Sequence, residues 1–153
     1  SDGQIGSNQT FPDTDFPMLR LGDVYLLYAA AALRGGGDKG RALDLVNDLR
    51  DRAYGPDNSA GDITQSELDL EFILDERLRE LYHEAHRRTD LIRYEVAGGH
   101  PELGFSSKGT WAWKGDVQQG ATTPACKNVY PIPETQLNAN SELEQNEGYP
   151  GCN

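Results

Sequence analysis

Three glutamates at four-residue intervals are the first side chains in this sequence that could carry out a reaction. Glu76, Glu80 and Glu84 would share one face of a helix, because residues four apart are neighbours on a helix surface. Paired carboxylates are the groups with which a glycoside hydrolase cleaves a glycosidic bond. Ion-pair networks also produce such clusters, and we favour that structural role. The sequence therefore predicts no catalytic residue and no enzymatic activity.

Metal and phosphate sites are not expected either. The segment His83-Glu84-Ala85-His86 places its histidines three residues apart, whereas the H-E-x-x-H zinc motif needs four. No further histidine or cysteine stands at a ligand spacing. The glycine run Gly35-Gly36-Gly37 lacks the strand and the lysine of a phosphate-binding loop. We expect no metal and no cofactor.

Two tryptophans are the candidate ligand-binding residues. Trp111 and Trp113 alternate in a glycine-rich segment, and this spacing points both rings the same way in an extended chain. Aromatic planes of this kind can pack against the apolar face of a sugar ring. The alternative is that both tryptophans anchor the segment onto the helices, and the usual packing role of large aromatic residues favours it.

Two cysteines, Cys126 and Cys152, both lie in loop-like sequence. In an oxidising compartment they could pair and tie a long loop to the C-terminus, which would stabilise the fold by roughly 3–4 kcal/mol in the chain-entropy model. Two free thiols are the alternative, and the sequence does not decide between them. Our hypothesis is that they pair.

An arginine on an apolar helix face needs a polar partner. Arg77 lies between Leu74 and Leu78, so its guanidinium should find a carboxylate or backbone carbonyls. We expect Arg77, Glu80 and Arg87 to form a partly buried network that locks two helical hairpins together. The same structural network is expected to include Arg20, Glu84 and Asp90.

The composition is that of one globular domain with many loops. The chain has 153 residues, of which 37% are hydrophobic, and 25 acidic against 14 basic residues give a net charge of -11. This field repels phosphate backbones and anionic lipid headgroups, so we expect no nucleic-acid partner. No stretch approaches the roughly 20 apolar residues that span a bilayer. The polar start shows no signal peptide, as expected of a mature chain or of an excised fragment.

Helical periodicity first appears after a polar, proline-containing lead-in. A first helix is expected to be buried nearly all round, and the glycine run at 35–37 ends it. Asp38 is a suitable N-cap for a second helix, so the pair forms a hairpin. The expected face of the first helix comprises Leu21, Val24, Tyr25, Tyr28, Ala31 and Ala32. The expected face of the second helix comprises Ala42, Leu45, Val46, Leu49 and Ala53.

A second hairpin is expected to follow a polar loop at 54–62. Thr64 and Glu67 have the spacing of a capping box that opens a third helix, and a fourth runs from His86 to about Val96. The apolar stripe of the third helix comprises Leu70, Ile73, Leu74, Leu78, Leu81, Tyr82 and Ala85. Two hairpins in succession have the layout of tetratricopeptide repeats, although the repeat consensus is absent.

The rest of the chain is predicted to be mostly irregular. We expect hairpins over 19–96, an irregular loop over 97–128 and an extended tail over 129–153 that packs back on the helices. Within the tail, 129–133 reads as extended and 133–137 as a single helical turn. The predicted fold class is therefore mainly α, in one domain.

Three blocks of sequence together resemble the SusD/RagB family. Residues 16–29 (FPMLRLGDVYLLYA) resemble its FP-x-x-R-x-A-D-V-x-L-x-Y-A-E-A helix. Residues 73–81 (ILDERLREL) and 86–93 (HRRTDLIR) resemble I-L-x-E-R-x-x-E-L-x-x-E-G-H-R-x-x-D-L-x-R. Residues 130–140 (YPIPETQLNAN) and 145–149 (QNEGY) resemble the closing Y-P-I-P-x-x-E-L-x-x-N-P-x-L-x-Q-N-P-G-Y. The blocks occur in order, at fitting intervals, over nearly the whole chain.

The chain departs from the family pattern at several positions. Ala30 replaces a glutamate that would partner a neighbouring arginine, Ala85 replaces a glycine, and Ser141 and Glu147 replace prolines. Family members are several times longer and carry a lipidated N-terminus. The chain therefore resembles their C-terminal part, and we expect it to belong to a longer protein.

The resemblance implies a function as well as a fold. It implies a SusD-like α-α superhelix and a non-catalytic, surface-exposed outer-membrane lipoprotein that captures glycans or other nutrients. The implied partner is a TonB-dependent transporter of the SusC type, and the nutrient need not be starch. The alternative is a tetratricopeptide-like protein-interaction module with no small-molecule ligand of its own.

Overall fold

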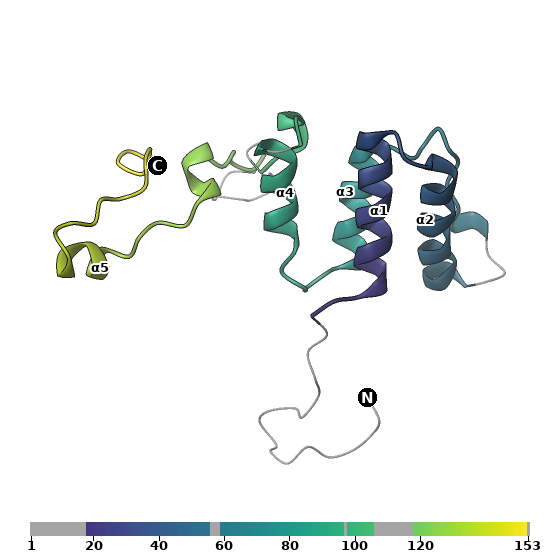
Figure 1. Cartoon of the computed structure of the whole chain (residues 1–153), viewed down its shortest axis with the longest axis horizontal. Helices are drawn as coiled ribbons and strands as arrows, with labels where there is room; N and C mark the ends of the chain where they lie inside the picture. Colours follow the sequence, from purple (N-terminus) through teal and green to yellow (C-terminus); the bar gives the residue numbers. More distant parts are fainter. Residues whose placement is uncertain (1–17, 56–58, 97, 106–117, 153) are drawn as a thin grey trace, which may run out of the picture. The chain divides into compact units, whose positions relative to one another are not determined.

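The computed structural model describes residues 18–55, 59–96, 98–105 and 118–152. The chain divides into two compact units, Ser1–Asp69 and Leu70–Asn153. The described residues are mainly helical and contain no strand, which confirms the predicted class (Figure 1). None of the described helices is long and apolar enough to cross a membrane. Five α-helices lie within these described ranges, namely α1 (Leu21–Gly35), α2 (Lys39–Tyr54), α3 (Leu70–Glu80), α4 (Arg87–Val96) and α5 (Glu134–Ala139).

The first unit is a helical hairpin of α1 and α2, which lie side by side (Figure 1). Gly36 ends α1 at φ 73°, a left-handed conformation that glycine adopts without steric cost, and its N–H donates to the carbonyl of Ala32. Asp38 then caps α2 by accepting the backbone N–H of Arg41 at 2.9 Å. The predicted glycine turn and N-cap are both confirmed.

The predicted buried face of α1 is wrong in part. Leu21, Val24 and Tyr28 are exposed, so the helix is not buried all round. Its buried side is instead dominated by small residues, namely Gly22, Ala29, Ala30 and Ala32, together with Leu26. Small side chains allow another backbone to come close: a Cβ added at Gly37 would lie 3.1 Å from the Cα of Ala32. The buried positions of α1 thus hold mainly small residues, whereas several large apolar residues of the predicted face are exposed.

The predicted face of α2 is confirmed at four of its five positions. Ala42, Leu45, Val46 and Leu49 are buried, whereas Ala53 is exposed near the end of the helix. The chain after α2 is held against its polar side. Asn47 accepts the N–H of Ile63 at 3.0 Å and donates to its carbonyl at 3.1 Å, while Arg50 donates to the carbonyl of Gly61.

The third helix starts later than predicted. Glu67 accepts the Thr64 N–H and hydroxyl, both at 2.8 Å, as in a capping box. These contacts close a turn, however, and α3 begins only at Leu70. The hydrogen bonds from the backbone and then the side chain of Thr64 lower the pKa of Glu67. The Thr64–Glu67 contact of the predicted capping box is therefore present, but no helix follows it directly.

The turn between α3 and α4 has two residues in a left-handed conformation. His83 has φ 64° and Ala85 has φ 61°, although neither is a glycine. Because α3 ends at Glu80, the predicted stripe does not continue to Tyr82, which is exposed, and Leu78 is exposed as well. The fourth helix, α4, begins at Arg87, within one residue of the predicted start.

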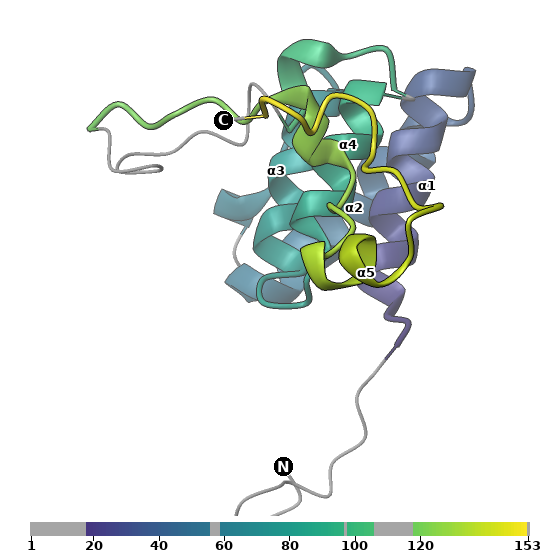
Figure 2. The same cartoon turned by 90° about the vertical axis from the view of Figure 1, so that its left-hand side faces the viewer.

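The core of the second unit lies between α3, α4 and the segment after them (Figure 2). Leu74 of α3 packs with Leu91 and Tyr94 of α4 and with Leu103. Leu103 belongs to a short 3-10 helix, Pro101–Leu103, inside the predicted irregular loop. Two partly buried residues, Leu70 and Phe105, complete this cluster.

The C-terminal tail lacks long helices and is held by side-chain contacts to backbone groups. It comprises a 3-10 helix, Ala125–Asn128, the short helix α5 and irregular chain. Gln145 accepts the Ile132 N–H at 3.0 Å and donates to its carbonyl at 2.9 Å. The Asn146 amide donates to the Tyr130 carbonyl, and the Tyr149 hydroxyl donates to that of Val129.

Candidate functional site

A buried ion pair joins the two helices of the second unit. The Nε of Arg77 on α3 lies 2.7 Å from Oδ2 of Asp90 on α4, and the side chains are only 3% and 5% exposed. The other oxygen of Asp90 accepts from Arg93 at 2.9 Å. The expectation that Arg77 would find a carboxylate is therefore met. Its partner is Asp90, whose carboxylate also accepts from Arg93.

The other members of the predicted network have varied partners. Arg87 donates to the Leu74 carbonyl at 2.7 Å and lies 3.4 Å from the carboxylate of Asp75. These contacts link α3 to α4, within the second unit. Arg20, Glu80 and Glu84 also have interaction partners. That all six residues act as one network locking two hairpins together stays a prediction.

The three glutamates considered for acid–base chemistry do not share one helix. Glu76 is buried and accepts a 2.6 Å contact from Arg79, so its carboxylate is used in an ion pair. The helix ends at Glu80, and Glu84 lies in the following turn. Among the described residues there is also no group of three metal-ligating side chains.

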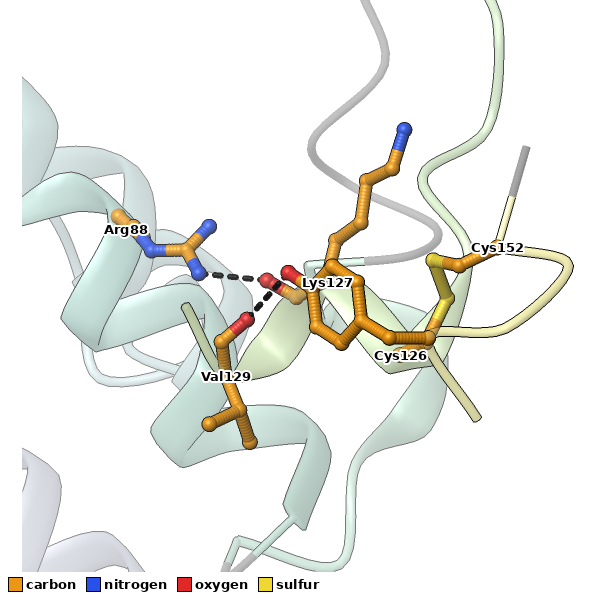
Figure 3. Close-up of a disulfide and its surroundings, with 6 residues drawn as sticks. Arg88, Cys126, Lys127, Val129 and Cys152 are labelled. Carbon is orange, nitrogen blue, oxygen red and sulfur yellow. Dashed lines mark hydrogen bonds between the residues drawn. A yellow bond between two sulfur atoms is a disulfide. The ribbon is translucent and has the colours of Figure 1, made fainter. Parts of the chain in front are cut away.

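Arg88 attaches the C-terminal tail to α4. Its guanidinium donates to the carbonyl of Lys127 (Figure 3). It also lies 4.7 Å from the ring centre of Phe105 and 4.5 Å from that of Tyr130. A guanidinium over aromatic faces gains cation–π attraction. This contact of Arg88 was not predicted from the sequence, because no periodicity connects Arg88 with a segment about 40 residues away.

A disulfide closes the tail next to this arginine. Cys126 and Cys152 are joined, with their Cα atoms 6.3 Å apart (Figure 3). Lys127, whose carbonyl accepts from Arg88, directly follows Cys126. We call residues 126–152 the disulfide lobe. Its covalent closure and the contact to Arg88 thus involve neighbouring residues within the 3-10 helix Ala125–Asn128.

Beside Arg88 lies a hollow of about 740 Å³, which we call the α4 hollow. One side is α4 and the turn before it, and the other is the start of the disulfide lobe, represented by Asn128 and Tyr130. Three arginines, Arg87, Arg88 and Arg93, contribute to its wall. No acidic side chain is found among its described lining residues, in a chain with 25 acidic residues.

The predicted ligand-binding tryptophans, Trp111 and Trp113, lie outside the described residues. Their role in sugar binding or in packing therefore stays a prediction. The α4 hollow, in turn, was not predicted from the sequence. Tyr130 stands in a recognised block, but only folding brings it to α4.

Comparison with known proteins gives one consistent answer. A model of the SusD family matches residues 1–149. The starch-binding protein SusD of Bacteroides thetaiotaomicron is 39% identical over 149 residues, which are 97% of this chain and 24% of that protein. The crystal structure of a SusD superfamily protein from Bacteroides vulgatus has a TM-score of 0.61 and 31% identity, over 95% of this chain and 31% of the other.

The chain matches only part of each of these longer proteins. The chain spans about a quarter of the length of the curated relative and about a third of the solved one. The binding proteins of this family are non-catalytic, in agreement with the absence of a predicted active site. With residues 1–149 matched and 39% identity to a curated member, the chain belongs to the SusD family.

Proposed function

We propose that this chain is the C-terminal part of a non-catalytic nutrient-binding lipoprotein of the outer membrane. It would capture glycans or other nutrients at the cell surface for uptake through a SusC-like TonB-dependent transporter. The observation that carries this proposal is the family match over residues 1–149, together with a relative whose name states that it binds starch. Nutrient binding and an outer-membrane location are properties of the family as a whole.

The fold supports this proposal at the level of layout. The pairs α1–α2 and α3–α4 are each joined by a turn and packed together. We interpret them as tetratricopeptide-like hairpins, the arrangement that the family resemblance implies. The predicted division into hairpins, irregular loop and tail is part of the same proposal.

A glycan array followed by calorimetry tests the binding function. The chain should bind at least one neutral or acidic oligosaccharide, and binding should change tryptophan fluorescence if Trp111 and Trp113 line the site. Unchanged fluorescence with a bound glycan would assign both tryptophans to packing. Absence of binding to every glycan, by the longer protein as well, would contradict glycan capture. Co-purification with a transporter barrel tests the partner separately.

One observation favours a second function for the first unit. Four large apolar side chains of α1 are exposed, from 40% for Tyr28 to 64% for Leu21, with Val24 and Leu27 between them. Exposed apolar side chains that cluster on one helix are typical of protein-interaction surfaces. The alternative is therefore a tetratricopeptide-like interaction module. Loss of a co-purifying protein in Val24→Ser and Leu27→Ser variants that still bind glycan would assign this role.

A further inference from the structure

We propose that the α4 hollow binds the carboxylate of an acidic sugar, so that the chain takes a uronic-acid-containing oligosaccharide there. This inference rests on the proposed glycan-binding function and narrows it to one class of glycan at one place. The volume of the hollow, about 740 Å³, lies within the roughly 300–1,000 Å³ of ordinary ligand sites.

The hollow is lined by positively charged side chains, whereas the chain as a whole carries a negative net charge. The sequence has a net charge of -11, yet Arg87, Arg88 and Arg93 line the hollow without an acidic side chain among its described lining residues. A guanidinium has five N–H donors. Arg93 uses one in its contact with Asp90, and Arg88 uses one on the Lys127 carbonyl. Arg87 uses one on the Leu74 carbonyl and one on Asp75. The remaining donors suit a carboxylate, whose two oxygens match the planar fork of a guanidinium.

A second polar feature calls for a hydroxyl group. Asn128 is one of the residues that line the hollow, and its side-chain oxygen Oδ1 is buried with no hydrogen-bond partner in the described part of the chain. A buried acceptor without a donor costs free energy that a bound ligand can recover. A carboxylate cannot donate to it, whereas a sugar hydroxyl can. The ligand should therefore carry hydroxyls as well as a negative charge.

Apart from Thr89, the other side chains that line the hollow are apolar or aromatic. Tyr130 and Val96 are 73% and 69% exposed, and Ile92 beside them is half-buried. The C–H face of a pyranose ring packs well on such surfaces. A free inorganic anion would leave these side chains unused, and a fatty acid would leave Asn128 unpaired. An acidic sugar is the class of ligand that uses all three features.

Calorimetry with two matched probes tests the inference. Trigalacturonate should bind at least about tenfold more tightly than its fully methyl-esterified form, which has the same backbone without the charges. Arg93→Gln should abolish this preference. The fold should survive this change, because the buried carboxylate of Asp90 still has its ion pair with Arg77 at 2.7 Å. Arg41→Gln removes the same charge from an exposed arginine in the first unit and should preserve the preference.

An isosteric variant provides an independent arm. Asn128→Asp introduces a carboxylate into the hollow, so trigalacturonate binding should be lost while the ester is affected much less. Equal affinity for both probes, or a preference that survives both variants, would overturn the inference. No binding of either probe would also overturn it. The proposed function would still stand if other glycans bound on the array, so the two failures are distinguishable.

Discussion

At the scale of single residues, Ala85 is an unfavourable choice for its backbone conformation. Its φ of 61° lies in the left-handed region, where the Cβ of an L-residue comes too close to the backbone. The family has a glycine at the corresponding place in the second block of resemblance. The strain thus follows from one local departure from the family sequence, in the turn that leads into α4.

Replacing Ala85 by glycine should stabilise the protein. We expect Ala85→Gly to raise the free energy of unfolding by roughly 0.5–1 kcal/mol, because the relieved strain of about 1–2 kcal/mol exceeds the added chain entropy of glycine. Urea denaturation measures the change. Ala31→Gly, at an exposed position within α1, is the matched control and should destabilise by about 1 kcal/mol. A loss of stability in both variants would contradict the assignment of strain to Ala85.

The Arg77–Asp90 pair should matter far more than any surface ion pair. Removing one partner leaves the other as a buried charge with fewer opposite charges and hydrogen bonds around it, which is unfavourable. Arg77→Ala should therefore cost about 3 kcal/mol and lower the melting temperature by roughly 6–12 °C. Asp90 keeps Arg93, so the loss should stay below that of a wholly isolated charge. Thermal melts monitored by circular dichroism measure it.

The control for this variant is an arginine without a side-chain role. Arg41 is exposed, and its capping contact uses only the backbone N–H. Arg41→Ala should thus change the unfolding free energy by less than about 0.5 kcal/mol. The double variant Arg77→Met with Asp90→Leu should recover part of the loss, because both buried charges are gone. Equal melting temperatures for Arg77→Ala and the unsubstituted chain would refute this role.

At the scale of elements, the disulfide lobe replaces regular structure by specific contacts. Ile132 stands between two prolines, which have no N–H, so its own backbone groups are the natural points of attachment. The side-chain amide of Gln145 satisfies both of them. With Asn146 and Tyr149 bonded to nearby carbonyls, the lobe is a series of side-chain-to-backbone bonds closed by one covalent bond.

Thiol chemistry gives a direct check on this lobe. The denatured, unreduced protein should show no free thiol, whereas two titratable thiols would refute the pairing. A Cys126→Ser, Cys152→Ser variant should be less stable by up to roughly 3–4 kcal/mol, because it loses the closure of a 26-residue separation. Reduction of the unsubstituted chain should have the same effect, and the reduced protein is therefore the control.

The elements differed in how well the sequence predicted them. Helical periodicity predicted α1, α2 and α4, and the glycine turn and Asp38 cap were correct in detail. It failed on the buried face of α1, because periodicity counts large apolar residues whereas close helix packing favours Ala29 and Ala32. The α4 hollow could not be predicted, since residues about 40 positions apart meet there through irregular chain.

At the scale of the whole molecule, the excess of negative charge should oppose folding. A net charge of -11 is compressed into a smaller volume when the chain folds, and this self-repulsion lowers stability. Salt screens it, with a Debye length of about 10 Å at 0.1 M. The buried Arg77–Asp90 pair is shielded from solvent and should respond little.

Salt should therefore affect folding and acidic-ligand binding in opposite directions. Between about 10 mM and about 500 mM NaCl, the melting temperature should rise, while trigalacturonate should bind more weakly because the arginines of the α4 hollow are screened. Differential scanning calorimetry and titration calorimetry on the same samples measure both. The methyl ester, which carries no charge, is the control. A melting temperature that falls with salt would mean that favourable surface ion pairs outweigh the repulsion.

The covalent closure of the tail also affects how the protein would respond to proteases. The helix α5 and the chain around it are mostly exposed, so this segment offers accessible peptide bonds. A cut anywhere between Cys126 and Cys152 would leave both fragments joined through sulfur. A nicked chain would then migrate as intact on a non-reducing gel and separate only after reduction. A segment cut in this part of the chain would stay attached to the protein through the disulfide.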